Sequence, residues 1–434
     1  MKKIISLIIV CTIIISGMFM YNKSDKKDLL EDSSGPIMAA VIDGKASTTF
    51  PTTNKYVATV ECTRNGVKQD VDAKAIWNGT KWVVSFNDIS VGNVRCNATF
   101  ITKVPAFSET ILANNEVKTP ITTPGAAVST ADEALLASAE DDYGTSYYFR
   151  GAVTNNYVEF ANKCWRIVRV GGDGSVKLIL HNDNTTKVAN PCNSANNSAS
   201  AAFARYSGAT YTSKFNENKD DNAYVGFMYG TVDADDYAAT HANTNKSTIL
   251  TNLENWYNNN LKVYESVIDD NIWCTDKTNI TDISYNPWSY GKKPTGLGYG
   301  TNKTYYGATQ RLVSSSGSAG GTGPSLKCNG KLSKIKSKIG LLTADEVVFA
   351  GYAYGLNNGT TYLQENATDG WLWTLSPVEF SPIGRAHVWR VGGKAGNFGH
   401  DSVSDAGNVR PSISLKPSTN VTGDGTSEKP YIVN

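Results

Sequence analysis

The chain has 434 residues, and its 41 lysines and arginines nearly balance its 40 aspartates and glutamates, leaving a formal charge of +1. That balance argues against a nucleic-acid-binding protein, because such proteins usually carry a large basic excess. The 40 asparagines and 38 glycines tolerate positive φ and favour turns. We therefore expect β structure with long polar loops rather than a helical bundle, divided into two or three domains.

The N-terminal segment predicts where the protein resides. Lys2 and Lys3 precede an uncharged, largely apolar run over residues 4–21, and a helix of that length spans about 27 Å, close to the roughly 30 Å hydrocarbon core of a bilayer. No small-x-small cleavage site follows the run. We predict a signal anchor over 1–22, a charged stalk over 23–36, and a single-pass protein of the cell membrane whose bulk is extracellular. A cleaved signal peptide and a soluble chain remain alternatives.

Six cysteines follow the apolar run, which itself contains Cys11: Cys62, Cys96, Cys164, Cys192, Cys274 and Cys328. An even number without a CxxC pair favours disulfides over zinc ligation. The first two lie in one short β-rich module and predict one bond. For the other four, proximity in sequence favours Cys164–Cys192 and Cys274–Cys328, while the two other pairings, and free thiols, stay open.

Residues 37–104 predict a small all-β module. Apolar and polar residues alternate over 56–62 and again over 94–100, as in half-buried strands. Asn65-Gly66 and Asn78-Gly79 are hairpin signals. We expect an immunoglobulin-like β-sandwich that acts as a spacer. Residues 105–142, which lack a regular pattern, are predicted to be a linker containing one short helix over 130–139.

The remaining residues, 143–434, are predicted to form one large domain. It begins with a β-meander over 147–180 and ends with strands over 371–376, 387–391 and 409–415. Two helices are expected, one after Ser247 and one after the capping box that begins at Thr343. Residues 275–330, rich in Gly, Ser, Asn and Thr, are expected to form an insertion held by Cys274 and Cys328.

The usual catalytic signatures are missing from this sequence. None of the four histidines belongs to a HExxH or HxH motif, and no GxSxG elbow or P-loop is present. The aspartates at 220, 221, 233, 235 and 236 lack EF-hand spacing. We therefore predict no catalytic residue, no cofactor and no metal, which favours a protein that is not an enzyme. Carboxylate pairs for glycoside hydrolysis depend on the fold and cannot be identified from sequence.

We place the predicted ligand-binding region at residues 385–408. The glycines of the segment 392–407 favour an irregular backbone, so we expect a large loop between two strands. The aromatic and polar side chains of this loop suit ligand recognition. For Trp389 a place in the core is an equally good interpretation. The predicted ligand-binding residues are His387, Trp389, Arg390, Asn397, Phe398, His400, Asp401 and Asp405.

Several motifs in the large domain carry a resemblance. They are Asp-Tyr-Gly-Thr-Ser-Tyr-Tyr-Phe-Arg-Gly at 142–151, Cys-Trp-Arg-Ile-Val-Arg at 164–169, Tyr-Val-Gly-Phe-Met-Tyr-Gly at 224–230 and Gly-Leu-Leu-Thr-Ala-Asp-Glu at 340–346, followed by Trp-Thr-Leu-Ser-Pro and Val-Arg-Pro. The domain resembles a family of Gram-positive gut-bacterial surface proteins of unknown function. Its closing pattern is similar to the major paralogous domain of fibre-degrading bacteria and to formylglycine-generating-enzyme-like variants of the C-type lectin fold.

The resemblance implies a mixed α+β, C-type-lectin-like domain whose exposed loops bind ligands. It transfers no catalytic residues, because the chain matches neither the paired active-site cysteines of sulfatase-modifying enzymes nor the calcium-binding Glu-Pro-Asn of a C-type lectin. We expect α+β architecture with much β structure: a small immunoglobulin-like sandwich followed by this domain.

The functional prediction is a membrane-anchored, adhesin-like binding protein that recognises a glycan or protein of a host or neighbouring cell. The alternatives are an extracellular carbohydrate-active enzyme and a structural, pilus-like surface subunit. A further hypothesis is diversification of the binding region by mutagenesis of Asn codons. All of the following are amino acids that such mutagenesis could produce: His387, Arg390, Asn397, Phe398, His400, Asp401, Ser402, Asp405 and Asn408.

Overall fold

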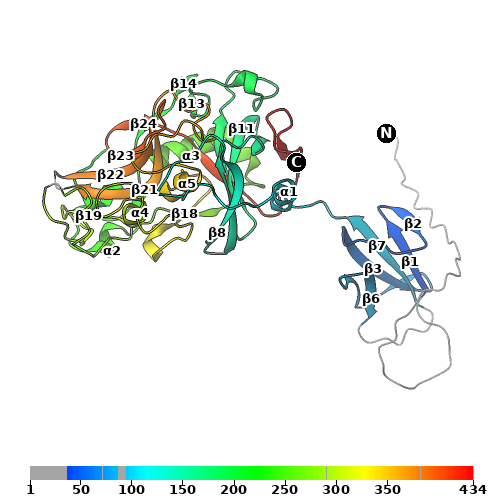
Figure 1. The fold of residues 1–434 in the computed structure, drawn as a ribbon. Coiled ribbons are helices and arrows are strands. Elements are labelled where there is room, and N and C mark those ends of the chain that lie inside the picture. Colours follow the sequence, from blue (N-terminus) through cyan, green and yellow to red (C-terminus); the bar gives the residue numbers. More distant parts are fainter. Residues whose placement is uncertain (1–36, 71, 87–93, 290, 382, 434) are drawn as a thin grey trace. The chain divides into compact units, whose positions relative to one another are not determined.

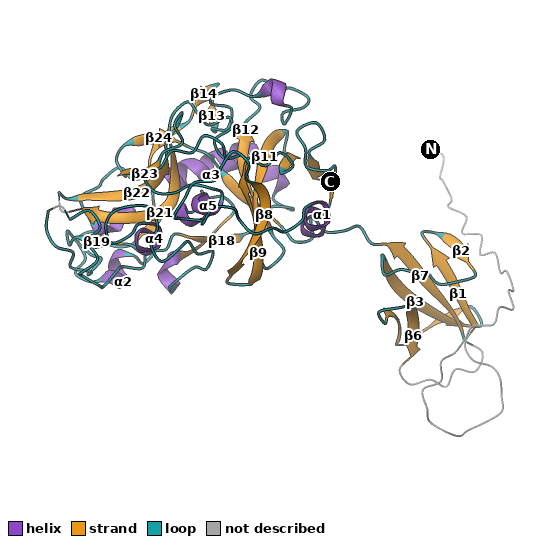
Figure 2. Ribbon diagram, viewed as in Figure 1, coloured by secondary structure: helices purple, strands orange, loops and turns teal. Residues whose placement is uncertain are grey.

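The computed structural model describes residues 37–433 except 71, 87–93, 290 and 382, so the predicted anchor and stalk lie outside the described residues (Figure 1). The chain divides into two compact units, Met1–Val104 and Pro105–Asn434. Among the described residues, strands outnumber helices in both units, and strands drawn in orange are prominent in Figure 2. The predicted predominance of β structure with long loops is therefore confirmed. Across the described ranges, every helix is too short or too polar to cross a bilayer.

The first unit contains a five-stranded sheet and a separate hairpin. The sheet has the order β2-β1-β7-β3-β4, with β1 parallel to β7 and the other neighbours antiparallel. The two-residue turn Asn65-Gly66 joins β3 to β4 with positive φ at both residues, as the sequence predicted. The seven strands are β1 Ile37–Ile42, β2 Lys45–Ser47, β3 Tyr56–Arg64, β4 Val67–Gln69, β5 Ala73–Trp77, β6 Trp82–Phe86 and β7 Arg95–Thr102.

A small aromatic core joins the hairpin β5–β6 to the sheet. Phe100 is fully buried, and its ring lies 5.3 Å from that of Trp82 and 5.1 Å from that of Phe50, measured between centroids. Cys62 and Cys96 face each other on β3 and β7 and form the predicted disulfide. The alternating burial of β3 and β7 follows from this arrangement, because one face of the sheet is covered and the other is not.

The predicted linker, 105–142, is instead an integral part of the second unit. It contains α1, Phe107–Asn114, whose Phe107 is fully buried with its ring 5.2 Å from that of Tyr431. The predicted helix over 130–139 is wrong, because β8 occupies Ala134–Asp141. This strand pairs over its whole length with β9, Gly144–Gly151. Pairing across that tight turn outweighs the modest helix propensity of an Ala- and Leu-rich segment.

Eight strands form the first sheet of the second unit. Its central path is β25-β12-β11-β10-β27-β26, with β9 paired to β11 and β8 to β9. Strand β10 lies parallel to β27, so the early and final segments of the unit share one sheet. The strands not yet given are β10 Tyr157–Phe160, β11 Lys163–Val170, β12 Val176–Asn182, β25 Ser412–Leu415, β26 Val421–Thr422 and β27 Tyr431–Val433.

Six strands form the second sheet, with the path β15-β24-β21-β22-β23 and with β19 paired to β21. The predicted loop over 392–407 is wrong, because β23 and the first part of β24 lie within it. Hydrogen bonding to β22 fixes β23, despite the glycines around it. The bounds are β15 Thr212–Lys214, β19 Thr304–Tyr305, β21 Leu372–Ser381, β22 Arg385–Val391, β23 Phe398–Ser402 and β24 Ala406–Asn408.

Short helices and hairpins complete the second unit. Ser247 caps α3 through its side chain, and Thr343 and Glu346 form the predicted capping box of α5. These elements are the helices α2 Tyr237–Thr240, α3 Thr248–Asn260, α4 Gly307–Leu312 and α5 Ala344–Phe349, the 3₁₀ turns η1 Ser194–Asn196, η2 Asn222–Val225, η3 Lys262–Tyr264 and η4 Lys331–Ser333, and the short strands β13 Arg205–Tyr206, β14 Ala209–Thr210, β16 Met228–Tyr229, β17 Asn245–Lys246, β18 Asn271–Cys274 and β20 Lys334–Ser337.

The two remaining disulfides also form as proximity predicted. Cys164 of β11 is bonded to Cys192, and Cys274 at the end of β18 is bonded to Cys328. The second of these bonds closes the predicted insertion. One large hydrophobic core joins both sheets to α3 and α5, so the long connections lie over a single continuous interior.

Candidate functional site

Most of the predicted binding residues lie on two adjacent strands, β22 and β23. Their antiparallel register places Trp389 opposite His400, Val391 opposite Phe398 and His387 opposite Ser402. Because side chains alternate across a sheet, His387, Trp389, Phe398 and His400 share one face, while Arg390 and Asp401 lie on the other. The sequence region therefore forms a two-sided hairpin.

The two aromatic residues of the prediction belong to the core. Trp389 and Phe398 are both fully buried, and their rings stack with centroids 4.8 Å apart. Tyr354 packs edge-on against Trp389 and covers it. Neither aromatic side chain is accessible to a ligand in this structure, which corrects their predicted role. Strand alternation alone does not explain this burial, because Val388 on the other face of β22 is also fully buried; this part of the hairpin is packed on both faces.

The polar residues of the hairpin form a compact accessible group. Arg390 Nε lies 3.5 Å from Asp401 Oδ2, and these side chains are 23% and 39% exposed. Asn397 Oδ1 lies at 3.5 Å from the Arg390 guanidinium. Asp405 is exposed in the turn between β23 and β24. Partial burial and the charge of Asp401 raise the pKa of Asp405, so this side chain accepts a proton more readily than an isolated aspartate.

The opposite face of the hairpin holds a carboxylate–histidine pair. Glu379 of β21 pairs with His387 in the sheet register and is fully buried. Its Oε1 lies 3.4 Å from His387 Nδ1, and the His387 side chain keeps 14% of its surface exposed. The His400 ring is 5.5 Å from that of His387. Burial, with a smaller effect from His387, lowers the pKa of His400 to about 4.

Sequence reasoning missed Glu379. The available signal was a lone acid within the apolar stretch 372–380, Leu-Trp-Thr-Leu-Ser-Pro-Val-Glu-Phe. A carboxylate in a buried strand requires partners, and such residues often mark functional sites. That signal cannot identify His387 as the partner, because the partner depends on the register between β21 and β22.

Two arginines of the quoted motifs, Arg150 and Arg166, have structural partners. Arg150 and Glu133 are fully buried, with Nε 3.0 Å from Oε1. Arg166 contacts Glu365 and stacks on the Tyr157 ring at 3.7 Å. Both arginines are fully buried and ion-paired, so they stabilise one arrangement of the first sheet.

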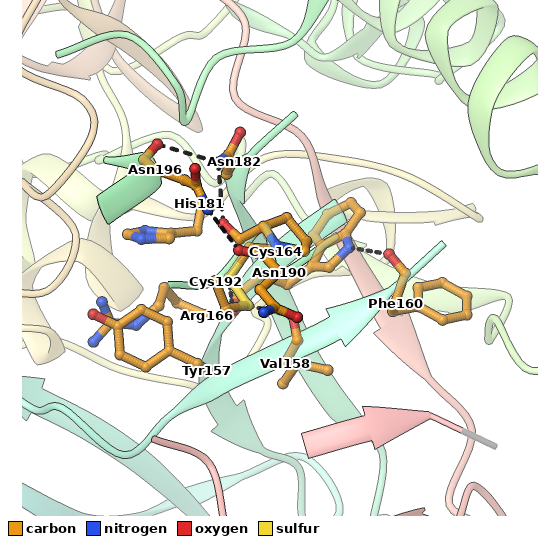
Figure 3. Close-up of a disulfide and its surroundings, with 12 residues drawn as sticks. Tyr157, Val158, Phe160, Cys164, Arg166, His181, Asn182, Asn190, Cys192 and Asn196 are labelled. Carbon is orange, nitrogen blue, oxygen red and sulfur yellow. Dashed lines mark hydrogen bonds between the residues drawn. A yellow bond between two sulfur atoms is a disulfide. The ribbon is translucent and has the colours of Figure 1, made fainter. Parts of the chain in front are cut away.

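Figure 3 shows the Cys164–Cys192 disulfide with Arg166 and Tyr157 near it. The bond ties β11 to the segment that follows Asn190, and His181 lies nearby, fully buried. Burial and the nearby Arg166 and Arg410 hold the pKa of His181 well below its ordinary value. This histidine is therefore neutral at physiological pH, and its surroundings form a polar part of the core.

A charged cavity of about 50 Å³ lies elsewhere in the second unit, beside the Cys274–Cys328 bond. Two ion-pair networks line it. In one, Glu346 accepts hydrogen bonds from Arg169 and Lys177; in the other, Arg311 bonds to both Asp345 and Asp276. These residues come from β11, β12, α4, α5 and the segment after β18.

Among the described residues, no group of three or more His, Cys, Asp or Glu side chains is placed to hold a metal ion. Comparison with models of protein families, with curated proteins and with solved structures finds no match to the chain. The structure shows a mostly β protein of two units. One disulfide lies within the first unit and two lie within the second.

Proposed function

We propose that the protein is a membrane-anchored extracellular binding protein that recognises a glycan or protein ligand through the accessible face of the β22–β23 hairpin. The observation that carries the proposal is the accessible group of Arg390, Asn397, Asp401 and Asp405 on a hairpin whose aromatic residues are locked in the core. A polar surface on a rigid base loses little conformational entropy on binding. The three disulfides favour an oxidising compartment, and the apolar run of the sequence supplies the proposed anchor.

The proposal assigns an architecture to each unit. The first unit is taken as an immunoglobulin-like spacer, supported by a sheet, a packed hairpin and a crosslink between facing strands. The second unit is taken as C-type-lectin-like, supported by its mixed sheets, short helices and long connections. Diversification of the binding region would be confined to accessible positions, because Phe398 and Ser402 are buried and changes there disturb packing.

A paired-charge variant tests the binding surface. Full-length protein in detergent is applied to glycan and protein arrays, and the hits are compared with those of the double variant Arg390→Ala/Asp401→Ala. We expect this double variant to lose at least tenfold in affinity, because each of its two substitutions removes a side chain that would contact the ligand. The matched control is Lys336→Ala/Asp270→Ala, which removes another exposed ion pair of the same unit. Equal loss in both variants, or no loss in the first, would contradict the proposal.

The Glu379–His387 pair favours a second candidate, an extracellular carbohydrate-active enzyme. A buried carboxylate that orients a partly exposed imidazole is an arrangement suited to general acid–base catalysis. Turnover on a panel of cell-wall and dietary glycans that disappears in Glu379→Gln would support this candidate. Binding without turnover would leave the binding protein as the better description.

A further inference from the structure

The cavity beside Cys274–Cys328 contains more negative than positive charge. Among its inner groups, four carboxylates, each at most 6% exposed, face three cations, so the formal excess there is one negative charge; the exposed Asp142, Asp173 and Lys327 line the outer part of the cavity. Burial lowers the pKa of Lys177 to about 8, which still leaves this lysine mostly protonated at pH 7. An uncompensated charge in the interior is costly, so the cavity favours an additional cation. The carboxylates are Asp141, Asp276, Asp345 and Glu346, and the cations are Arg169, Lys177 and Arg311.

The unused hydrogen-bonding capacity of the cavity lies on Asp276. Its Oδ2 accepts a hydrogen bond from Arg311 Nη1 at 2.5 Å, but its Oδ1 has no hydrogen-bond partner within the described part of the chain. Asp276 is only 2% exposed and lines the cavity. Both oxygens of Asp345 and both oxygens of Glu346 accept hydrogen bonds. The Oδ1 atom of Asp276 is therefore a buried acceptor without a donor, and because it has almost no accessible surface, a donor in the cavity reaches it through a rotation of the carboxylate.

The chemistry of the cavity selects among small ligands. An anion is disfavoured, because carboxylates of the protein already engage Arg169, Lys177 and Arg311. A bound Ca²⁺ or Mg²⁺ needs several converging oxygens, and the described acids do not converge in this way. An ammonium group suits better, because it is compact and donates three hydrogen bonds. A volume of 50 Å³ holds about three to five waters, or an ammonium on a short carbon stem.

We propose that this cavity binds the protonated primary amine of a small ligand, with Asp276 Oδ1 accepting one of its hydrogen bonds. The amine supplies the missing positive charge and the missing donor together. Tyr143 and Asp173, both exposed, line the same cavity and place its opening at the surface. This binding does not depend on the β22–β23 hairpin.

Calorimetric titration of the full-length protein with methylammonium chloride at pH 7 tests the proposal. Sodium chloride serves as the salt-matched reference, and tetramethylammonium, which has no N–H donor, as the chemical control. We expect saturable binding of methylammonium and none of tetramethylammonium. Asp276→Asn should weaken methylammonium binding at least tenfold, which corresponds to about 1.4 kcal/mol. Asp282→Asn removes an exposed carboxylate of the same insertion and should leave the affinity unchanged.

A second variant keeps the test decisive if Asp276→Asn fails to fold. Ser325→Trp narrows the cavity while leaving all four carboxylates in place, and the backbone N–H of residue 325 can still donate to Asp345. We expect a folded protein that no longer binds methylammonium. Absence of methylammonium binding by the unmodified protein would overturn the proposal. Full affinity in a folded variant would do the same, as would equal binding of tetramethylammonium or preferential binding of Ca²⁺.

Discussion

Glu346 performs two structural tasks with one carboxylate. It accepts hydrogen bonds from Lys177 and Arg169 in the interior, and its Oε2 accepts the backbone N–H of Thr343 at the start of α5. Burial alone would raise the pKa of Glu346, but the charges of Lys177 and Arg169 outweigh it and lower the pKa to about 2. A residue fixed in this way joins α5 to the first sheet.

Replacing this carboxylate is therefore expected to destabilise the second unit. Glu346→Gln leaves Lys177 and Arg169 buried without their shared partner, and breaking a buried ion pair costs about 3–5 kcal/mol. Chemical denaturation at pH 7 measures the loss. The control is Glu254→Gln, whose partly exposed ion pair with Lys246 should contribute less than about 1 kcal/mol. Equal stability of the two variants would show that Glu346 is not a structural anchor.

The same residue gives a pH dependence. The pKa of Glu346 in the folded protein is about 2, below its ordinary value of 4.5, so the unfolded chain binds the proton first as pH falls. The stabilisation is complete above about pH 4.5 and disappears progressively toward pH 2. The difference in unfolding free energy between the unmodified protein and Glu346→Gln should shrink across this range.

At the scale of elements, the sequence predicted the helix starts and the hairpin turn that depend on interactions between residues close together in the chain. Ser247 and Thr343 mark the starts of α3 and α5, because capping depends on residues within one turn. Asn65-Gly66 marks a hairpin for the same reason. The strand β8 and the strands within 392–407 escaped prediction, because each is stabilised by pairing with another strand. The Glu379–His387 contact escaped for the same reason, since only the sheet register brings these residues together.

The Cys274–Cys328 bond is expected to stabilise the insertion strongly. It closes a loop with a sequence separation of 54 residues, for which the chain-entropy model gives about 4 kcal/mol. Cys274→Ser/Cys328→Ser should lower the unfolding free energy of the second unit by up to that amount and expose the insertion to protease. Cys62→Ser/Cys96→Ser, which opens the bond of the first unit, should leave that protease pattern unchanged. An unaltered pattern in the first double variant would show that packing alone holds the insertion.

At the scale of the whole molecule, the three disulfides indicate the kind of cellular compartment in which the protein resides. Each unit has its own hydrophobic core and at least one disulfide. The bonded cysteines are almost entirely buried at positions 62, 96, 164 and 192. Disulfides persist where the surroundings are oxidising, which the proposed extracellular location provides. The state of the thiols in living cells therefore reports on the location of the bulk of the chain.

Maleimide labelling of the full-length protein from cells tests this location. Six cysteines are bonded in pairs, so we expect at most one reactive thiol, that of Cys11, when cells are lysed in denaturant containing a polyethylene-glycol maleimide. Prior reduction should raise the number to seven, and each label shifts the band on a denaturing gel. Carbonate extraction of the same cells should leave the chain in the membrane pellet. A soluble chain with all seven thiols reactive before reduction would place the protein in the cytosol and remove the basis for an extracellular receptor, because the proposed ligand-binding hairpin would then never meet a neighbouring cell.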